Sequence, residues 1–190
     1  MNKLIYLALA SVVVAQLQGC AAAVVGGAAV GASVAVDRRT TGVYVSDQEI
    51  EVKALERLSK AYPEKANSIS ATSYNKQVLL TGQVQDDATR TGAVKLVKAI
   101  PDVRTVFDEL NVGPVSSLTT EANDSAITSN VKARLLADDR VPSGTIKVVT
   151  ESGVVYLMGL VTEAEAKAAT AVASSSSGVT KVVTLFEYIN

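Results

Sequence analysis

The residue best suited to covalent chemistry in this chain of 190 residues is Cys20, its only cysteine. It stands in the stretch VVVAQLQGCAAAVVGG, directly after an apolar run and before a run of alanines. A single cysteine excludes an internal disulfide and the paired-cysteine spacing of zinc sites. The sequence also has no histidine, which excludes histidine-based acid/base catalysis and histidine ligation of metals. A buried thiol, a reactive nucleophile and a chemical attachment point remain as roles for Cys20.

Two pairs of adjacent carboxylates, Asp86/Asp87 and Asp138/Asp139, are the other candidates for chemistry. Paired carboxylates can transfer protons or hold a hard cation. Both pairs stand beside expected turns or helix starts, where an aspartate interacts with the helix dipole or faces solvent. No glycine-rich phosphate loop accompanies them. We therefore expect a protein that is not an enzyme and that uses no metal and no dissociable cofactor.

The N-terminus indicates that the cysteine is an attachment point. A positive start at residues 1–3 precedes an apolar run over residues 4–15. This run fits the core of an export signal and is shorter than the roughly 20 residues that span a bilayer. Leu17 and Gly19 stand before the cysteine as in a lipobox, in which diacylglycerol alkylates the thiol. We predict a lipoprotein signal peptide over residues 1–19, with Cys20 as the acylated new N-terminus.

The residues after the cysteine read as a tether. Residues 21–36, AAAVVGGAAVGASVAV, are small and apolar and lack the side chains that build a core. A transmembrane helix of small residues is the alternative for this stretch. Diacylglycerol together with an N-acyl chain anchors a protein firmly, whereas a single chain anchors it only marginally. Ala21 rather than aspartate after the cysteine follows the sorting pattern of outer-membrane lipoproteins. We predict a flexible tether over residues 20–45.

An internal repeat organises the rest of the chain. The stretches VLLTGQV at 78–84 and VYLMGLV at 155–161 occupy the same place in two copies, 46–114 and 122–190, joined by a linker at 115–121. Each copy has the pattern helix, hairpin, helix, strand. The fold class is therefore α+β, with two tandem αββαβ domains, each a three-stranded mixed sheet packed against two helices.

Local signals place the elements of both copies. The glycines that end the second strands, Gly82 and Gly159, suit a bulge or the close approach of a helix. The expected elements of the first copy are a helix behind the cap candidates Ser46/Asp47, strands 69–74 and 78–84, a helix 86–100 and a strand 103–112. Those of the second copy are a helix behind Asn123/Asp124, strands 146–150 and 154–161, a helix 162–173 with Thr162 and Glu165 as a capping box, and a strand 179–189.

The repeated unit resembles a known domain family. The segments VLLTG at 78–82, VYLMG at 155–159 and GVTKVV at 178–183 are similar to those of the BON domain of bacterial envelope proteins. The first copy has Pro101-Asp102-Val103 where that family usually has a glycine. With the lipoprotein-type signal, the whole chain resembles the dual-BON outer-membrane lipoproteins of Gram-negative bacteria, the DolP/YraP family. The stretches NDSAITSNVKARLL and VYLMGLVTEAEAKAA make this match specific.

The resemblance implies an outer-membrane lipoprotein, facing the periplasm, that supports envelope integrity, binds anionic phospholipid through its second domain and concentrates at division sites. In that family the first helix of the second domain carries an exposed aromatic residue, which can anchor in the headgroup layer. Here the matching position is Ala126. In an alternative interpretation, Ile127 packs in the core and the cations Lys132 and Arg134 form a solvated face. The expected phospholipid-binding residues are Ala126, Ile127, Asn130, Lys132, Arg134 and Leu136.

The charge limits the partners. Eighteen basic and 19 acidic residues give a formal net charge of −1, so the chain lacks the basic field that attracts nucleic acid. An anionic phospholipid membrane is the expected partner, approached through a local basic patch. The alternative is a periplasmic interaction module that contacts an outer-membrane assembly protein or peptidoglycan.

Overall fold

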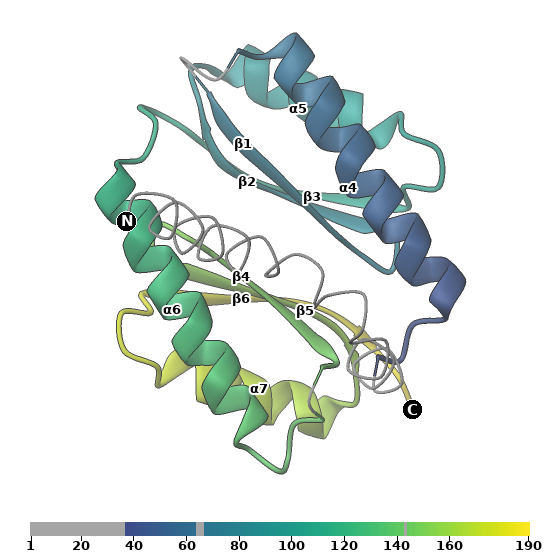
Figure 1. Ribbon diagram of the computed structural model, residues 1–190, viewed down its shortest axis with the longest axis vertical. Coiled ribbons are helices and arrows are strands. Elements are labelled where there is room, and N and C mark those ends of the chain that lie inside the picture. Colours follow the sequence, from purple (N-terminus) through teal and green to yellow (C-terminus); the bar gives the residue numbers. More distant parts are fainter. Residues whose placement is uncertain (1–36, 64–66, 143) are drawn as a thin grey trace, which may run out of the picture. The chain divides into compact units, whose positions relative to one another are not determined.

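The structure, a computed structural model, describes residues 37–63, 67–142 and 144–190. The expected signal peptide, Cys20 and the tether up to residue 36 lie outside the described residues. The described chain runs twice through helix, two strands, helix and strand (Figure 1). The first copy consists of α4 (Thr41–Ala61), β1 (Ser68–Tyr74), β2 (Gln77–Val84), α5 (Asp87–Lys98) and β3 (Thr105–Val112). The second consists of α6 (Leu118–Leu136), β4 (Ile146–Glu151), β5 (Val154–Val161), α7 (Glu163–Ser174) and β6 (Lys181–Tyr188).

Each copy contains one three-stranded mixed sheet. The two strands of each hairpin are antiparallel, and the third strand lies parallel to the second. A parallel neighbour requires a crossover connection, which α5 supplies in the first copy and α7 in the second. The register repeats as well, since Val78 pairs with Val106 and Val155 with Val182. The predicted α+β fold of two αββαβ units is confirmed.

One face of each sheet packs against the two helices of its own copy. In the first copy, Leu58 of α4, Val97 of α5 and Leu80 of β2 belong to one buried apolar cluster. Val131 of α6 and Leu157 of β5 belong to the matching cluster of the second copy. Successive side chains of a strand point to opposite faces of the sheet, so these residues account for only half of each strand. Each copy therefore has its own hydrophobic core.

The first helix of each copy begins earlier than predicted. Thr40 caps α4 and Ser117 caps α6, each accepting a hydrogen bond from the backbone N–H three residues ahead. The predicted caps, Asp47 and Asp124 with the residues just before them, instead lie inside the helices. The end of the expected tether, from residue 41 to 45, is therefore helical, as is the expected linker from residue 118 onward. The capping box predicted for α7 is confirmed.

The glycines at the ends of β2 and β5 are required by a neighbouring strand segment rather than by a helix. A Cβ on Gly82 would lie 1.8 Å from the carbonyl oxygen of Ser68. The φ of Gly82, +115°, is also one that side-chain-bearing residues rarely adopt. A Cβ on Gly159 would lie 2.8 Å from the carbonyl oxygen of Thr145. The expected close approach occurs, but the backbone that enters the hairpin makes it.

The other faces of the two sheets bury side chains together. Tyr74 and Leu79 of the first copy form one buried cluster with Tyr156 and Met158 of the second. The phenol of Tyr74 donates a hydrogen bond to the carbonyl oxygen of Thr145, 2.9 Å away. Burial and the neighbouring Glu109 carboxylate raise the pKa of Tyr156 to about 12. The two copies thus share a third apolar cluster besides their own cores.

Candidate functional site

The expected lipid-binding residues all lie on α6, but the helix turns them in different directions. Ile127 belongs to the core of the second copy and is 9% exposed. Val131 and Leu135 share its stripe, because residues three to four positions apart lie on one face of a helix. Ile127 therefore packs mainly inward, as in its alternative interpretation, and only its edge reaches the groove that Ala126 lines.

Arg134 serves α7 rather than the solvent. Its guanidinium donates hydrogen bonds to the carbonyl oxygen of Val172 at 3.2 Å and to the hydroxyls of Ser175 and Ser176 at 2.9 and 2.7 Å. The last carbonyl groups of a helix have no partner within the helix, and a basic side chain there also interacts favourably with the helix dipole. Arg134 is half-buried, and its guanidinium is bound to the C-terminal end of α7, so the role expected for it in lipid binding stays a prediction.

Ala126 and Asn130 are exposed and, together with Ile127, line an open groove of about 520 Å³ whose lining surface is mostly apolar. Asn123 on the same helix and Ser177 in the loop after α7 line it as well. Ala126 offers only a methyl group at the position where the resembled family carries an aromatic residue. The groove can accept polar groups, and Ala126 contributes little apolar area to a membrane contact.

Lys132 and Leu136 form the part of the helix best suited to contact a membrane. Leu136 is 64% exposed, and Lys132 is exposed one turn before it. Both line a hollow of about 140 Å³ whose other walls include Val141 and Pro142. Among the described residues Lys132 has no ion-pair partner. An apolar hollow with a cation at its rim suits a molecule that joins an anionic head to an apolar chain.

The N-terminal half of α6 carries the opposite charge. Glu121, Asp124 and Glu151 line one groove with several hydroxyl side chains. Burial raises the pKa of Glu151, and the neighbouring carboxylates of Asp124 and Glu121 raise it further. An anionic surface would be repelled from this end of the helix. Electrostatics therefore favours the Lys132 end for any contact with anionic lipid.

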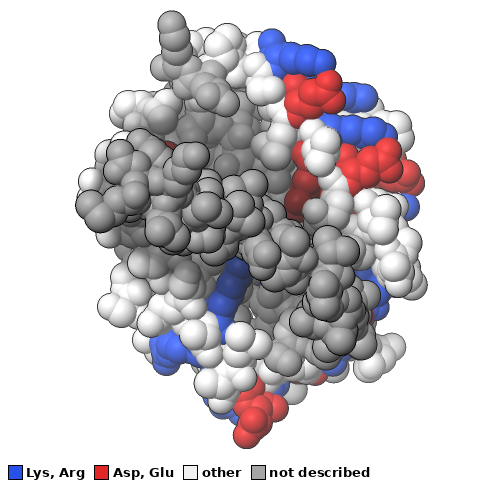
Figure 2. Space-filling view, in the orientation of Figure 1, with Lys and Arg blue, Asp and Glu red and all other residues white. Residues whose placement is uncertain are grey.

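On the face in Figure 2, blue and red side chains of the described residues alternate along the side where α4 runs. Two ion pairs on α4 join residues one helical turn apart, Lys53 with Glu49 and Lys60 with Glu56. Exposed pairs of this kind contribute only a few tenths of a kcal/mol to stability. Of the two basic residues on α6, Lys132 is exposed and Arg134 is half-buried.

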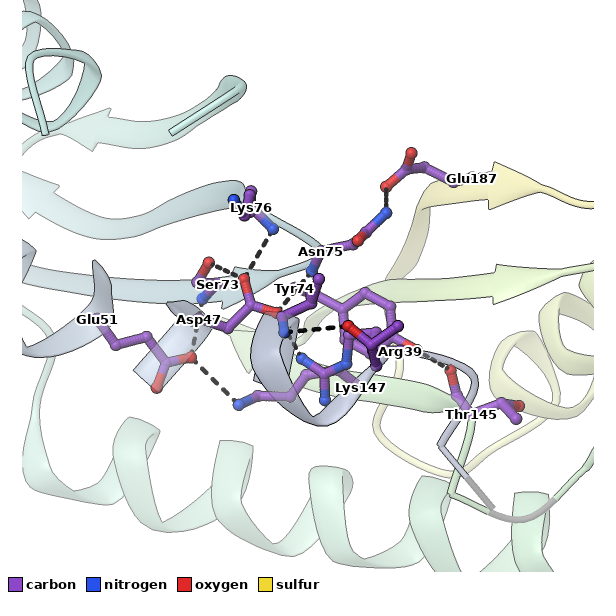
Figure 3. A network of polar contacts seen from close by, with 12 residues as sticks. Arg39, Asp47, Glu51, Ser73, Tyr74, Asn75, Lys76, Thr145, Lys147 and Glu187 are labelled. Atoms are coloured by element: carbon purple, nitrogen blue, oxygen red, sulfur yellow. Dashed lines mark hydrogen bonds and ion pairs between the residues drawn. The ribbon is translucent and has the colours of Figure 1, made fainter. Parts of the chain in front are cut away.

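A buried carboxylate that the sequence analysis took for a helix cap organises the first hairpin (Figure 3). Asp47 is fully buried and accepts hydrogen bonds from the hydroxyl of Ser73 at 2.7 Å and from the backbone N–H groups of Asn75 and Lys76 at 2.8 and 2.7 Å. It also forms an ion pair of 2.8 Å with Arg39. Asn75 and Lys76 both have positive φ, so Asp47 holds a turn that side-chain-bearing residues do not favour.

The second copy repeats this device. Asp124 accepts hydrogen bonds from the backbone N–H groups of Ser152 at 2.7 Å and Gly153 at 2.8 Å. Each aspartate stands three residues before a buried isoleucine, Ile50 or Ile127. Residues with this spacing share a helix face, so the spacing placed both aspartates toward the sheet. This spacing could have shown from the sequence that the two aspartates are not helix caps.

The adjacent carboxylates do not form a site. Asp86 caps α5 by accepting from the backbone N–H of Thr89. Asp138 forms an ion pair with Arg140, whose hydrogen bonds lower the pKa of Asp138 to about 2. Within the described ranges no group of three or more potential metal-ligating side chains comes together. None of the described helices is both long and apolar enough to cross a membrane. What remains as a candidate site is the exposed face of α6.

Comparisons with known proteins agree with the repeated unit. The BON domain family matches residues 46–114 and 123–190. The Outer membrane lipoprotein DolP of Haemophilus influenzae is 42% identical over 175 residues, which cover 92% of this chain and 91% of that protein. The 21 kDa hemolysin of Actinobacillus pleuropneumoniae is 34% identical over 155 residues, 81% of this chain and 80% of that protein. The Osmotically-inducible protein Y of Escherichia coli K12 is 38% identical over 144 residues, which cover 74% of this chain and 72% of that protein.

Proposed function

The chain belongs to the BON-domain family and, within it, to the dual-BON lipoproteins of the DolP family, and from this we propose a specific role at the outer membrane. The protein is an outer-membrane lipoprotein of the cell envelope. It is held by acyl chains on Cys20 and faces the periplasm, where it supports envelope integrity. Its second BON domain docks on anionic phospholipid, and the protein concentrates at division sites. No catalytic step is part of the proposal.

The anchor rests on the sequence around Cys20. Because residues 1–36 lie outside the described residues, the support is the signal, the lipobox and the full-length relationship to a named lipoprotein. A Cys20→Ala chain should be recovered in the soluble periplasmic fraction or remain unprocessed. A Cys20→Ala chain that is processed and still stays with the outer membrane would overturn the anchor.

Exposed Leu136 beside Lys132, which forms no ion pair with another described residue, is the observation that carries lipid docking. A leucine side chain moved from water into the acyl boundary contributes about 1.5–3 kcal/mol when fully buried. A lysine near an anionic surface adds about 1 kcal/mol. These are modest contributions, but acylation at Cys20 would keep the domain at the membrane, so weak docking suffices there.

Vesicle binding tests the docking face. The mature chain, made without acylation by a Cys20→Ser change, is titrated with vesicles rich in phosphatidylglycerol and with vesicles of phosphatidylcholine alone. Leu136→Ser and Lys132→Ala should each weaken binding to the anionic vesicles about five-fold or more. Leu118→Ser is the matched control, because Leu118 is 83% exposed at the acidic end of the same helix. Equal losses for the two leucine variants, or none for Leu136→Ser, would refute docking through this end.

An exposed apolar stripe on α4 favours the second candidate, an interaction module. Val45, Val52 and Leu55 are 59%, 66% and 45% exposed, and their spacing places them near one another on the helix surface. Apolar stripes with polar borders are typical of protein contacts. A partner protein of the outer-membrane assembly machinery, or peptidoglycan, captured in the absence of lipid and lost in a Val52→Ser chain would support this role. Capture that is unaffected by Val52→Ser would reject the stripe.

A further inference from the structure

Arg38, which precedes α4, is fastened to the second domain. Its guanidinium forms two hydrogen bonds with the carboxylate of Glu165, Nη1 to Oε2 at 2.6 Å and Nη2 to Oε1 at 2.8 Å. Nη1 also donates to the carbonyl oxygen of Leu160 at 2.9 Å. Bidentate pairing of arginine with carboxylate fixes direction as well as distance. Arg38 is therefore held at the end of β5 and the start of α7.

The next residue, Arg39, is fastened to the first domain. Its Nη1 lies 2.8 Å from Oδ2 of Asp47, and both side chains are nearly inaccessible, at 7% and 0% exposure. The guanidinium carbon lies 3.9 Å from the ring centroid of Tyr74 and 5.1 Å from that of Tyr44. A cation over aromatic faces in such a desolvated place adds to the ion pair. Figure 3 shows Arg39 beside Asp47 and Tyr74.

Two consecutive residues thus bind two different domains. Tyr74, on which Arg39 lies, itself donates to Thr145 of the second domain and belongs to the shared apolar cluster. We propose that Arg38 and Arg39 form a staple that closes the interface between the two BON domains just before the start of α4. The staple acts with further bonds across this interface: Asn75 and Arg104 donate to Glu187, Lys147 to Glu51, Gln83 to Glu151 and Tyr156 to Glu109.

The position of the staple gives it a consequence beyond stability. Arg38 and Arg39 stand 18 and 19 residues after Cys20, the acylation site of the proposed function, on which this point rests. Releasing the Arg38 end disconnects the domains at this point while leaving each domain's own core intact. The staple therefore makes the interface depend on two residues that are close in sequence to the expected anchor.

Oxidation of Met158 measures the opening of that interface. Met158 is the only methionine after Met1, is 1% exposed and lies in the shared cluster. Hydrogen peroxide converts its thioether to a sulfoxide with release of water, and mass spectrometry follows the reaction. In the full mature chain, Arg38→Ala should raise the oxidation rate roughly ten-fold, as expected for loss of a charge-assisted bidentate pair. An unchanged rate would overturn the staple.

Controls separate opening from unfolding and from loss of charge. The backbone amides of Leu80 and Leu157, inside the two cores, should keep their protection from hydrogen exchange in Arg38→Ala. Faster oxidation together with loss of that protection would mean unfolding and would refute the proposal. Arg140→Ala removes an equal charge and an ion pair within the second domain, and it should leave the rate unchanged.

A double variant tests whether the two arginines act as one device. A staple is open once either end is free, so Arg38→Ala/Arg39→Ala should oxidise Met158 no faster than the faster of the two single variants. Rate increases that multiply would show two independent local contacts and would contradict the staple. Arg38 is changed rather than its partner Glu165, because Glu165 also completes the capping box of α7.

Discussion

Replacing Asp47 with asparagine is the sharpest test of how the hairpins are held. The carboxylate accepts three hydrogen bonds, from Ser73, Asn75 and Lys76, and forms an ion pair with Arg39. Asparagine has nearly the same shape but only one accepting oxygen. The Asp47→Asn chain leaves at least one buried N–H without an acceptor and removes the carboxylate that pairs with the nearly buried guanidinium of Arg39. Breaking a buried pair of this kind destabilises a protein by about 3–5 kcal/mol.

The second copy supplies the internal comparison. Asp124 holds the equivalent turn with two backbone hydrogen bonds and has no ion-pair partner among the described residues. Asp124→Asn should therefore destabilise by about 1–3 kcal/mol. Urea denaturation of the complete chain, followed by circular dichroism, gives both differences in the free energy of unfolding. We attribute the larger destabilisation expected for Asp47→Asn to the loss of its ion pair with Arg39. If Asp47→Asn destabilised the chain no more than Asp124→Asn, this attribution would be wrong.

Three further changes have defined outcomes. Arg38 is the main cause that lowers the pKa of Glu165 to about 2 from 4.5. The stabilisation that a lowered carboxylate pKa provides is complete above the pKa of the unfolded chain. It is lost as pH falls through the pKa of the folded chain. The difference in urea midpoint between the parent and Arg38→Ala should therefore shrink as pH falls from about 5 towards 2, and a constant difference would contradict it. Ala126→Trp restores a large aromatic at an exposed position and should tighten binding to anionic vesicles about ten-fold, measured by the fluorescence of this single tryptophan. Gly82→Ala should destabilise the fold by several kcal/mol and by more than Gly159→Ala, since its Cβ would lie closer to a carbonyl oxygen and its φ is positive; equal urea midpoints would refute this.

Most of the fold could be predicted because its signals are local. The strand from Val154 to Val161 was predicted with the observed bounds, and Thr162 with Glu165 formed the predicted capping box. The first helices were placed too late for a physical reason. The opening turns of α4 bury no apolar side chain, and Val45 is 59% exposed. Hydrophobic periodicity therefore becomes visible only where the helix reaches the sheet, at Ile50.

The candidate site was predicted only in part. Sequence spacing placed Lys132, Arg134 and Leu136 at the end of one helix, and the structure leaves Lys132 and Leu136 exposed there. Arg134 instead donates to the carbonyl oxygen of Val172 in the last turn of α7 and to the hydroxyls of Ser175 and Ser176 just after it, across 38 to 42 residues of sequence. Which basic residue faces solvent depends on the neighbouring helix end, and no local pattern contains that information.

The sequence by itself determined the repeat, the element order, the lipobox and the family, because each of these is recognised from short segments of neighbouring residues. Only the tertiary structure decided how Asp47 and Asp124 are used, where the exposed charge of α6 lies, and that Arg38 and Arg39 reach different domains. Arg38 meets Glu165 across 127 residues and Tyr74 meets Thr145 across 71. Such partners are chosen by the packing of two complete domains, since a guanidinium or a phenol can satisfy its hydrogen bonds in many ways. The geometry of the fold selects one of them.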